Sequence, residues 1–300
     1  MTRTNVMSTA KRIRRQMSGG YQQQQEVLTV AIDDNDTTLQ FGGTLPLALV
    51  AGCTLGIDTE LLYVRSVNTS AFTATVTRGY ADSEAAAHVI SSMVDINPRF
   101  SLLSIVEAMR AEIATWAPRL FWVDAASATV DPTVAMYELP AKWADVVHIL
   151  TVLQQDGLDE EISWPQVDHK VVRGTRRSFT DAESSGIYLR FTEAIREEAI
   201  HITVALPFDP EDLPTTGDLV DDYNLTDGLV DLLEMGTKLR LTRDEQIAKQ
   251  QRHMQDDSRR AEETPIGTLV PLGQVLLATY TKRFNDEVLK LRQRYPYRQS

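Results

Sequence analysis

Residues Leu55 to Asp95 read LGIDTELLYVRSVNTSAFTATVTRGYADSEAAAHVISSMVD, and this stretch decides the N-terminal part of the fold. Apolar and polar residues alternate imperfectly from Ile57 to Val67 and cleanly from Phe72 to Thr77. Such alternation predicts strands with one buried face, and a short polar loop separates the two runs. Gly79 can take the positive φ that ends the second strand. We therefore predict a β-meander, with a third strand over residues 89–96.

The same stretch contains sequence pieces that recur in virion proteins of tailed bacteriophages. The pieces are Gly56, Ile57-Asp58-Thr59-Glu60, Val64-Arg65-Ser66-Val67, Thr75-Val76-Thr77-Arg78-Gly79 and Ala86-Ala87-His88. With these pieces the stretch resembles a segment of head–tail junction, tail and baseplate proteins. The resemblance implies a virion component that is assembled in the cytoplasm of the host bacterium.

Composition places the chain among ordinary globular proteins. It has 300 residues, of which 43% are hydrophobic and 24% charged, enough for two or three domains with cores of their own. The single cysteine, Cys53, excludes an internal disulfide framework and is expected to be a buried thiol. No apolar run approaches the roughly 18 residues that span a bilayer, so no membrane partner is expected.

Charge is distributed unevenly along the chain. The net charge is −12, yet residues 1–20 and 280–300 are basic, which leaves an acidic middle. Both ends are candidates for contact with an acidic partner, although a charge run is more often a solvated face. The candidate partner-binding residues are Arg3, Lys11, Arg12, Arg14, Arg15, Arg292, Arg294 and Arg298.

Local signals predict an α+β protein with five segments. We expect a basic arm over 1–25, a β-module over 26–96, a helix of a helical core over 97–123, an inserted β-domain over 124–210 and a C-terminal helical domain over 211–300. Within the arm, Lys11 to Met17 could form a short basic helix, but Gly19-Gly20 and Gln22 to Gln25 offer nothing to bury, and such arms usually become ordered on a partner.

The first helix is predicted from Asn97, a good N-cap, followed by Pro98 at the first helical position. Apolar residues recur on one face of this helix as far as Trp116, and the aromatic residues near its end are expected to fill a core or a subunit contact. In the inserted domain, alternation predicts a small sandwich. Its strand candidates are residues 146–153, 170–172, 187–191 and 199–206, and a proline- and acid-rich linker follows over 208–217.

The C-terminal region predicts three helices. The first carries Leu229, Leu232, Leu233 and Leu239, and a capping box of Thr242 and Glu245 is expected to begin the next. The last helix can open at Pro265 and has an apolar stripe that ends at Tyr295-Pro296. This stripe needs a partner, and the helix over 97–116 is available.

Two pieces of the C-terminal region also resemble the helical ends of phage head-to-tail adaptor proteins. They are DLLEMGTKLRL at residues 231–241, with the small residue Gly236, and LATYTKRFNDEVLKLRQRYP at 277–296, with Tyr280 and Phe284 at its centre. The resemblance implies an adaptor-like helical bundle and a twelve-fold homo-oligomeric ring. Simple adaptors are small and mostly helical, whereas this chain adds two β-regions.

Motifs for nucleotide, hydrolase and metal chemistry are absent from the sequence, so we expect neither an enzyme nor a cofactor. The histidines at 88, 148, 169, 201 and 253 lack metal-ligand spacing and are expected to be isolated structural residues. The acidic turn Asp33–Asp36 lacks the glycine and the distal glutamate of a calcium loop, which favours a plain turn. The acidic residues Glu193, Glu197 and Glu198, and the pair Asp168-His169, form no specific catalytic pattern.

Together these features predict a head-to-tail adaptor. Its partners would be the portal protein, the next neck or tail ring protein and further copies of the chain, with DNA passing through an acidic lumen without sequence-specific binding. The alternative is a minor tail or baseplate binding protein, which exposed aromatic residues such as Trp143 and Trp164 would favour. An unrecognised enzyme is the third alternative.

Overall fold

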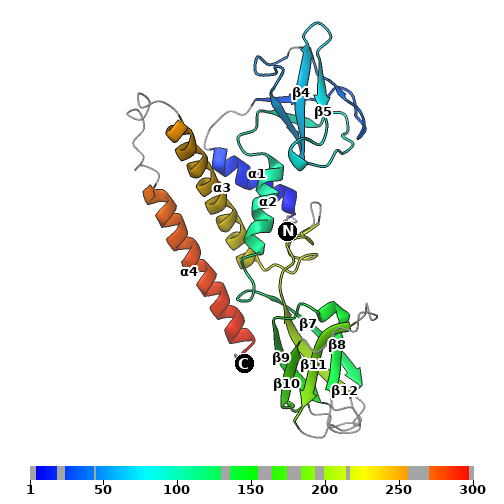
Figure 1. Ribbon diagram of the computed structural model, residues 1–300, viewed down its shortest axis with the longest axis vertical. Helices are drawn as coiled ribbons and strands as arrows, with labels where there is room; N and C mark the ends of the chain where they lie inside the picture. The colour runs from blue at the N-terminus through cyan, green and yellow to red at the C-terminus, as the bar shows by residue number, and fades with distance from the viewer. Residues whose placement is uncertain are drawn as a thin grey trace. The chain divides into compact units, whose positions relative to one another are not determined.

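The computed structural model describes residues 5–18, 24–43, 45–129, 136–154, 164–173, 184–192, 199–213, 217–255 and 270–296 (Figure 1). The helices in these residues are α1 (Val6–Ser18), α2 (Leu102–Ile113), α3 (Asp227–Gln255) and α4 (Val270–Arg294). The first six strands are β1 (Gln25–Val27), β2 (Thr38–Gln40), β3 (Thr54–Ile57), β4 (Glu60–Asn68), β5 (Thr73–Thr77) and β6 (Met93–Ile96). The other six are β7 (Trp122–Thr129), β8 (Met136–Pro140), β9 (His148–Gln154), β10 (His169–Arg173), β11 (Ser184–Phe191) and β12 (Ala199–Leu206). Helices and antiparallel sheets confirm the predicted α+β class.

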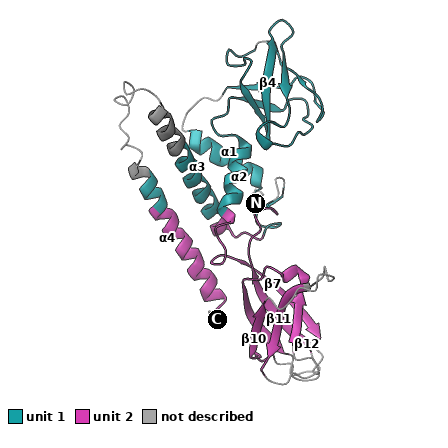
Figure 2. Cartoon of the chain, in the orientation of Figure 1, with its two compact units in different colours: residues 1–112, 213–223, 230–277 teal, residues 113–212, 224–229, 278–300 magenta. Residues whose placement is uncertain are grey.

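The chain divides into two compact units (Figure 2). Unit 1 consists of residues 1–112, 213–223 and 230–277, and unit 2 of residues 113–212, 224–229 and 278–300. The chain therefore passes from one unit to the other after residues 112, 212, 223, 229 and 277. Three of these crossings fall inside α2, α3 and α4.

The N-terminal sheet of unit 1 closes into a small barrel. Its strand order is β1-β6-β3-β4-β5-β2, and a bridge between Leu28 and Phe41 joins the two edge strands. The inward-facing side chains form one apolar core, in which Leu55, Leu62 and Val64 are fully buried. Closure removes the free edges that a sheet of short strands would otherwise expose.

The meander prediction is right for one hairpin and wrong for the third strand. β4 pairs with β5 as expected, and the Asn68 side chain accepts the amides of Ser70 and Ala71 at 3.1 Å to shape the loop between them. β6, however, pairs with β3 and β1 and not with β5. Only residues 93–96 of the predicted third strand are strand, because closing the barrel needs a crossing loop over residues 83–92.

Within the predicted N-terminal arm, residues 6–18 form the helix α1, which is longer than the predicted short helix over 11–17. Asn5 caps it, since its Oδ1 accepts the Ser8 amide at 2.6 Å. One face of the helix is buried and carries Val6, Ala10 and Ile13. These apolar residues are spaced three or four apart, so this helix could have been recognised from its sequence.

α2 begins four residues later than predicted. Asn97 is not its N-cap, because it has a φ of 46° and its Oδ1 accepts the Thr54 amide at 3.0 Å. Ser101 caps the helix and accepts the Ser104 amide at 3.0 Å. The predicted apolar face is buried, and Trp116 beyond the helix end is core.

α3 is one continuous helix where a break was predicted. Thr242 does not open a new helix, since its hydroxyl donates to the carbonyl of Lys238 inside α3 at 2.8 Å. Gly236 lies where α3 meets the end of α2, and a Cβ at this glycine would be 2.3 Å from the Glu112 carboxyl carbon. Glu112 also accepts the Arg240 Nε at 2.7 Å. A small residue at 236 therefore makes room for a buried carboxylate.

The later strands form the predicted sandwich in unit 2. One sheet has the order β10-β11-β8 and the other β7-β12-β9, and both contribute to one apolar core. The four predicted strand regions correspond to β9, β10, β11 and β12. β7 and β8 were not predicted, because β7 reads as small residues with little alternation in hydropathy.

Within unit 2, the apolar stripe of α4 packs on residues that follow α2, and its packing on the helix predicted over 97–116 stays a prediction. The Arg119 guanidinium lies 4.7 Å above the Phe284 ring, and its Nη2 donates to Asn285 at 2.7 Å. Further along, Leu291 and Tyr295 pack against a small cluster on the outer face of the β7-β12-β9 sheet, formed by Phe121, Leu150 and Ala205. Pro265, the predicted start of the helix, lies outside the described residues.

Within the described residues, none of the helices combines the length and apolar character that crossing a bilayer requires.

Candidate functional sites

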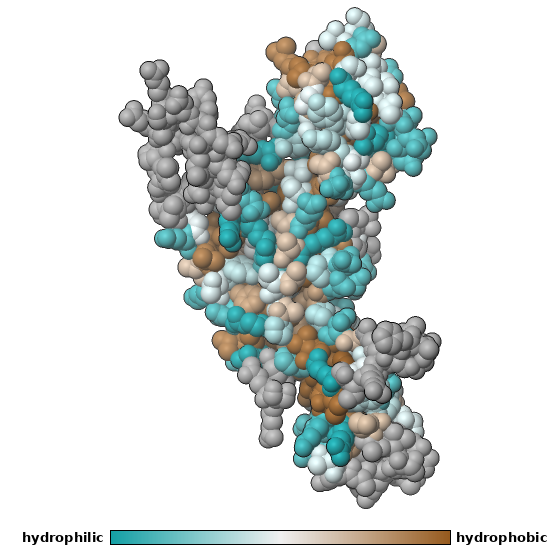
Figure 3. Space-filling view, in the orientation of Figure 1, coloured by the Kyte–Doolittle hydropathy of each residue, from teal (hydrophilic) through white to brown (hydrophobic). Residues whose placement is uncertain are grey.

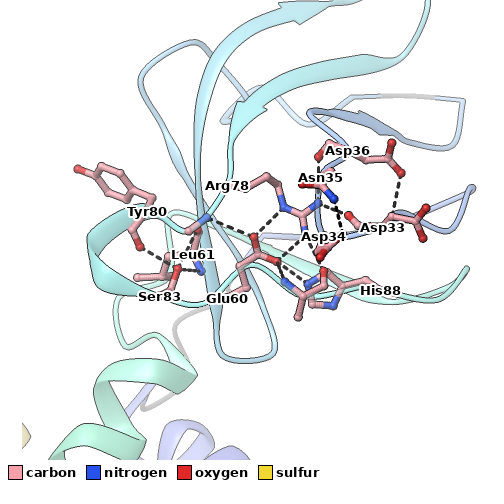
Figure 4. A network of polar contacts seen from close by, with 12 residues as sticks. Asp33, Asp34, Asn35, Asp36, Glu60, Leu61, Arg78, Tyr80, Ser83 and His88 are labelled. Atoms are coloured by element: carbon pink, nitrogen blue, oxygen red, sulfur yellow. Dashed lines mark hydrogen bonds and ion pairs between the residues drawn. The ribbon is translucent and has the colours of Figure 1, made fainter.

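The most organised polar site is a buried network in the barrel, formed by Glu60, Arg78 and His88 (Figure 4). Glu60 begins β4, Arg78 follows the end of β5, and His88 lies in the loop before β6. The three side chains expose only 1%, 7% and 6% of their surface. Three segments that are separated in sequence thus bring one charged or polar side chain each to the same buried point.

Glu60 is the acceptor at the centre of this network. Arg78 donates its Nε to one carboxylate oxygen at 2.7 Å and its Nη2 to the other at 2.8 Å. His88 Nε2 lies 2.8 Å from Oε2, and this nitrogen must carry the proton because an ionised carboxylate can only accept. The amide of Ala86 adds a further hydrogen bond at 3.2 Å.

Arg78 connects this carboxylate to two loops. Its Nη1 donates to the carbonyls of Asp33 and Asp36, and its Nη2 also donates to the carbonyl of Ala86. The guanidinium thereby fastens the turn over residues 33–36 and the loop before β6 to the same point. Arginine suits this role because its five N–H groups diverge in a fixed plane.

The electrostatics agree with an ionised centre. Burial alone would raise the pKa of Glu60, but the hydrogen bonds from Arg78, His88 and the Ala86 amide, together with the Arg78 charge, outweigh it. They hold the pKa of Glu60 at about 2, below the ordinary 4.5. The carboxylate is therefore charged at neutral pH, and its charge is compensated inside the barrel.

This network explains the sequence pieces that resemble virion proteins. Glu60, Arg78 and His88 are the conspicuous polar residues of the pieces IDTE, TVTRG and AAH, and Gly79 takes the expected positive φ of 60°. The polar residues of the three pieces therefore meet at one buried point of the barrel. The prediction that His88 is an isolated residue is wrong, because sequence separation concealed its partner.

The basic residues of α1 lie on acidic partners within unit 1. Lys11 reaches Asp58 at 3.4 Å, Arg12 pairs with Glu234 of α3, and Arg14 pairs with Asp95 of β6. Arg15 is exposed and has no ion pair among the residues that the structure describes, and Arg3 lies outside them. The three paired residues anchor α1 to its own unit, and their binding of an outside partner stays a prediction.

The basic residues at the other end lie on α4. Arg292 and Arg294 are exposed, and the Arg294 guanidinium lies 5.4 Å from the centre of the Tyr295 ring. Burial lowers the pKa of His148, and the charges of Arg173 and Arg292 lower it further. Arg298 lies outside the described residues, and partner binding by this group also stays a prediction.

The acidic turn after β1 is held by its own chain. Asp36 Oδ2 accepts the Asp33 amide at 2.8 Å, as in an ordinary turn. Among the described residues, no group of three or more histidine, cysteine, aspartate or glutamate side chains could hold a metal ion. Glu193, Glu197 and Glu198 lie outside these residues, and the His169 Nδ1 lies 3.1 Å from the Val167 carbonyl.

The two tryptophans whose exposure would favour a binding protein differ. Trp143 is fully buried and gives this alternative no support, and its Nε1 donates to Asp124 at 2.8 Å. Trp164 is 42% exposed, and its ring lies edge-on to His201 with centroids 6.3 Å apart. His201 Nδ1 lies 3.0 Å from the Ser127 hydroxyl on the neighbouring strand.

Comparison of the sequence with models of known protein families and with curated proteins finds no match for this chain.

Proposed function

We propose that the protein is a structural head-to-tail adaptor of a tailed bacteriophage. Copies of the chain would form a ring below the portal, join the capsid to the next neck or tail ring and let DNA pass. In this proposal the particle is assembled in the host cytoplasm, the chain becomes part of the virion at the head–tail junction, and the ring is a dodecamer.

The observation that carries the proposal is the role of the motif residues in the barrel. Glu60, Arg78 and His88 meet as a compensated, buried network and fasten two loops. A motif whose polar residues are used in this way favours a construction module over a catalytic one. The resemblance of this motif to virion proteins then supports a role in building the particle.

The helical region adds support from a second motif. Gly236, the small residue of DLLEMGTKLRL, accommodates the Glu112 carboxylate where α2 meets α3. The charges at this contact are compensated, since Arg240 donates to Glu112 and Arg12 pairs with Glu234. The resemblance of this region to adaptor helices thus involves a residue with a definite packing role.

The acidic character of the chain suits a channel for DNA. A lumen with a net charge of the same sign as phosphate avoids the ion pairs and counterion release that bind DNA tightly. Acidic lumen residues replaced by neutral ones should slow genome ejection. Unchanged ejection rates would count against this part of the proposal.

Cryo-electron microscopy of purified virions tests the proposal directly. Density for the barrel and sandwich in a ring directly below the portal, in a copy number equal to the ring symmetry, is the expected result. Density at the tail tip, or absence of the chain from the particle, would refute it.

The second candidate is a minor tail or baseplate protein that binds a host glycan or another tail protein. The exposed Trp164, edge-on to His201, favours this function because an aromatic ring beside polar side chains is a common feature of binding surfaces. The test is binding of the full chain to host cells before and after Trp164→Ala, with Val171→Ala as the exposed control. Loss of binding only in the first variant would support this candidate, and no binding by the unaltered chain would refute it.

A further inference from the structure

Two uncharged, apolar patches lie on the outside of the barrel, and Figure 3 shows brown, hydrophobic side chains on its surface. The first patch, here called the strip, follows residues 27–32 and 88–93. These two segments run antiparallel, since Val27 pairs with Met93 and Ile32 exchanges two backbone hydrogen bonds with His88. The strip exposes Val27 at 38%, Val30 at 48%, Val89 at 72%, Ile90 at 58% and Met93 at 49%.

The second patch, here called the loop patch, lies on the loop that leads into β3. Residues 45–52 read LPLALVAG, and Leu49 points inward while Leu47 is 97% exposed and Val50 53%. The Gly52 amide donates to the Val64 carbonyl at 2.8 Å, which holds the end of the loop beside β4. Tyr63 on β4 and Tyr80 extend the patch, with ring centroids 5.4 Å apart.

The patches occupy different parts of the barrel wall. The strip follows β1 and leads into β6, whereas the loop patch leads into β3 and lies beside β4, so the two consist of different segments of the barrel wall. Each exposes apolar surface of roughly the 400 Å² above which such a patch usually marks a binding site.

From these observations we propose that the strip of one copy binds the loop patch of the next copy, head to tail. A ring requires two different, complementary surfaces on each subunit, and the barrel carries two of similar size and chemistry. The inference rests on the proposed function, because it specifies which surfaces join neighbouring subunits of the ring.

Charge supports a second copy as the partner. Each chain has a net charge of −12, so copies repel one another wherever their charged surfaces meet. Residues 45–52 contain no charged side chain, and residues 85–93 contain only the buried His88. Contact between these patches brings the copies together without removing any charge from water. With their rims the two patches would bury on the order of 1,000 Å², the size at which specific interfaces begin.

The test uses one charge in each patch of the full-length chain. Sedimentation velocity at increasing concentration should show that Val89→Asp and Leu47→Asp each abolish self-association. Val171→Asp, at a 40% exposed valine of β10, is the matched control and should associate like the unaltered chain. Far-UV circular dichroism of all variants checks that they fold.

Mixing the two defective variants gives the decisive result. Val89→Asp keeps an intact loop patch, and Leu47→Asp keeps an intact strip. Their mixture should therefore form a heterodimer and no larger oligomer. If the strip instead bound another strip, Leu47→Asp alone would still dimerise and mixing would rescue nothing.

Cysteine pairing provides a second readout for weak association. The double variant Leu47→Cys, Val89→Cys, oxidised with copper phenanthroline at high concentration, should give a ladder of disulfide-linked multimers. Each single variant should give no ladder. A monomeric unaltered chain together with an absent ladder would overturn the inference.

These outcomes are separate from those of the proposed function. A ring below the portal whose subunits touch through other surfaces would refute the inference and leave the adaptor proposal in place. If the chain were located at the tail tip and its copies still paired head to tail, the adaptor proposal would be refuted and the inference would stand.

Discussion

The barrel and the sandwich bury their polar side chains in opposite ways. The barrel encloses a complete ion network around Glu60, of which 1% is exposed. The sandwich keeps its principal carboxylate, Asp124, at the edge with 24% exposed, where it accepts hydrogen bonds from Trp143 and Lys142. The difference teaches why the quoted sequence pieces lie in the barrel and not in the sandwich, since a buried network needs particular residues and an apolar core needs only a pattern.

The strongest test of this comparison is Arg78→Ala. It leaves the Glu60 carboxylate and three loop carbonyls without their donor, so we expect a loss of about 3–5 kcal/mol in the free energy of unfolding of the barrel. Hydrogen exchange of peptides from residues 54–96 during urea unfolding measures this loss of stability. The control is Arg65→Ala, an exposed arginine on β4, with an expected change within about 0.5 kcal/mol. Equal effects of the two variants would contradict the role of the network.

Unfolding of the two regions can be followed separately. All four tryptophans, at positions 116, 122, 143 and 164, belong to unit 2. Tryptophan fluorescence therefore monitors the unfolding of unit 2, which contains the sandwich, and does not detect the unfolding of the barrel. We expect Arg78→Ala to leave the midpoint of the fluorescence transition where it is, and a shift of that midpoint would show that the two regions unfold together.

Acid should weaken the barrel before the chain unfolds completely. The pKa of Glu60 is about 2 in the folded protein and 4.5 ordinarily, so its contribution to stability is full above pH 4.5 and is lost as the pH falls towards 2. Urea unfolding followed by hydrogen exchange between pH 6 and 3 should show this loss. Glu60→Gln should flatten the pH dependence over this range, and an unchanged slope would contradict the assignment.

Asp124→Ala probes the corresponding site in the sandwich and should have a smaller effect. It leaves the indole N–H of the fully buried Trp143 without its acceptor, which costs about 1–3 kcal/mol. The midpoint of the tryptophan fluorescence transition in urea measures this change. Burial would raise the pKa of Asp124, but the hydrogen bonds from Lys142, Trp143 and the Ala125 amide outweigh it and lower the pKa. A loss larger than that of Arg78→Ala would reverse the comparison.

The smallest expected effect is that of Lys11→Ala on α1. Lys11 and Asp58 are each about half exposed, with 50% and 52% of their side chains in contact with water. Exposed pairs of this kind contribute about 0–1 kcal/mol. Arg14→Ala is the informative companion, because its partner Asp95 is only 8% exposed and should make the loss larger. Thermal unfolding followed by far-UV circular dichroism compares the two.

Patterns in the sequence predicted where helices and strands lie better than they predicted which of these elements pair with one another. Alternation located β5 and β12, and apolar spacing located α2 and α4, because these signals depend on one face of a single element. The crossing of β6 to β3 could not be predicted, since register between distant strands depends on the closed barrel as a whole. Neither could the meeting of Glu60, Arg78 and His88, although each residue lies in a quoted motif piece.

The errors at helix ends have a common physical origin. Asn97 and Thr242 are good capping residues in isolation, but each makes a different hydrogen bond in the folded chain, to Thr54 and to Lys238. The positive charges of α1 suggested an outside partner, whereas the acidic partners Asp58, Glu234 and Asp95 lie far along the same chain. Capping and charge signals are local, and tertiary contacts decide between their alternatives.

The five crossings between the units mean that neither unit is a continuous gene segment. Unit 1 needs residues from before and after the sandwich, and unit 2 needs the short stretch 224–229 as well as the end of the chain. Shortening the chain from its N-terminal end therefore removes residues of unit 1 first, and shortening it from its C-terminal end removes residues of unit 2 first. A protease that cuts inside residues 113–212 would leave the two parts of unit 1 joined by the ion pairs Arg12–Glu234 and Arg240–Glu112 within that unit, so cleavage need not release either fragment.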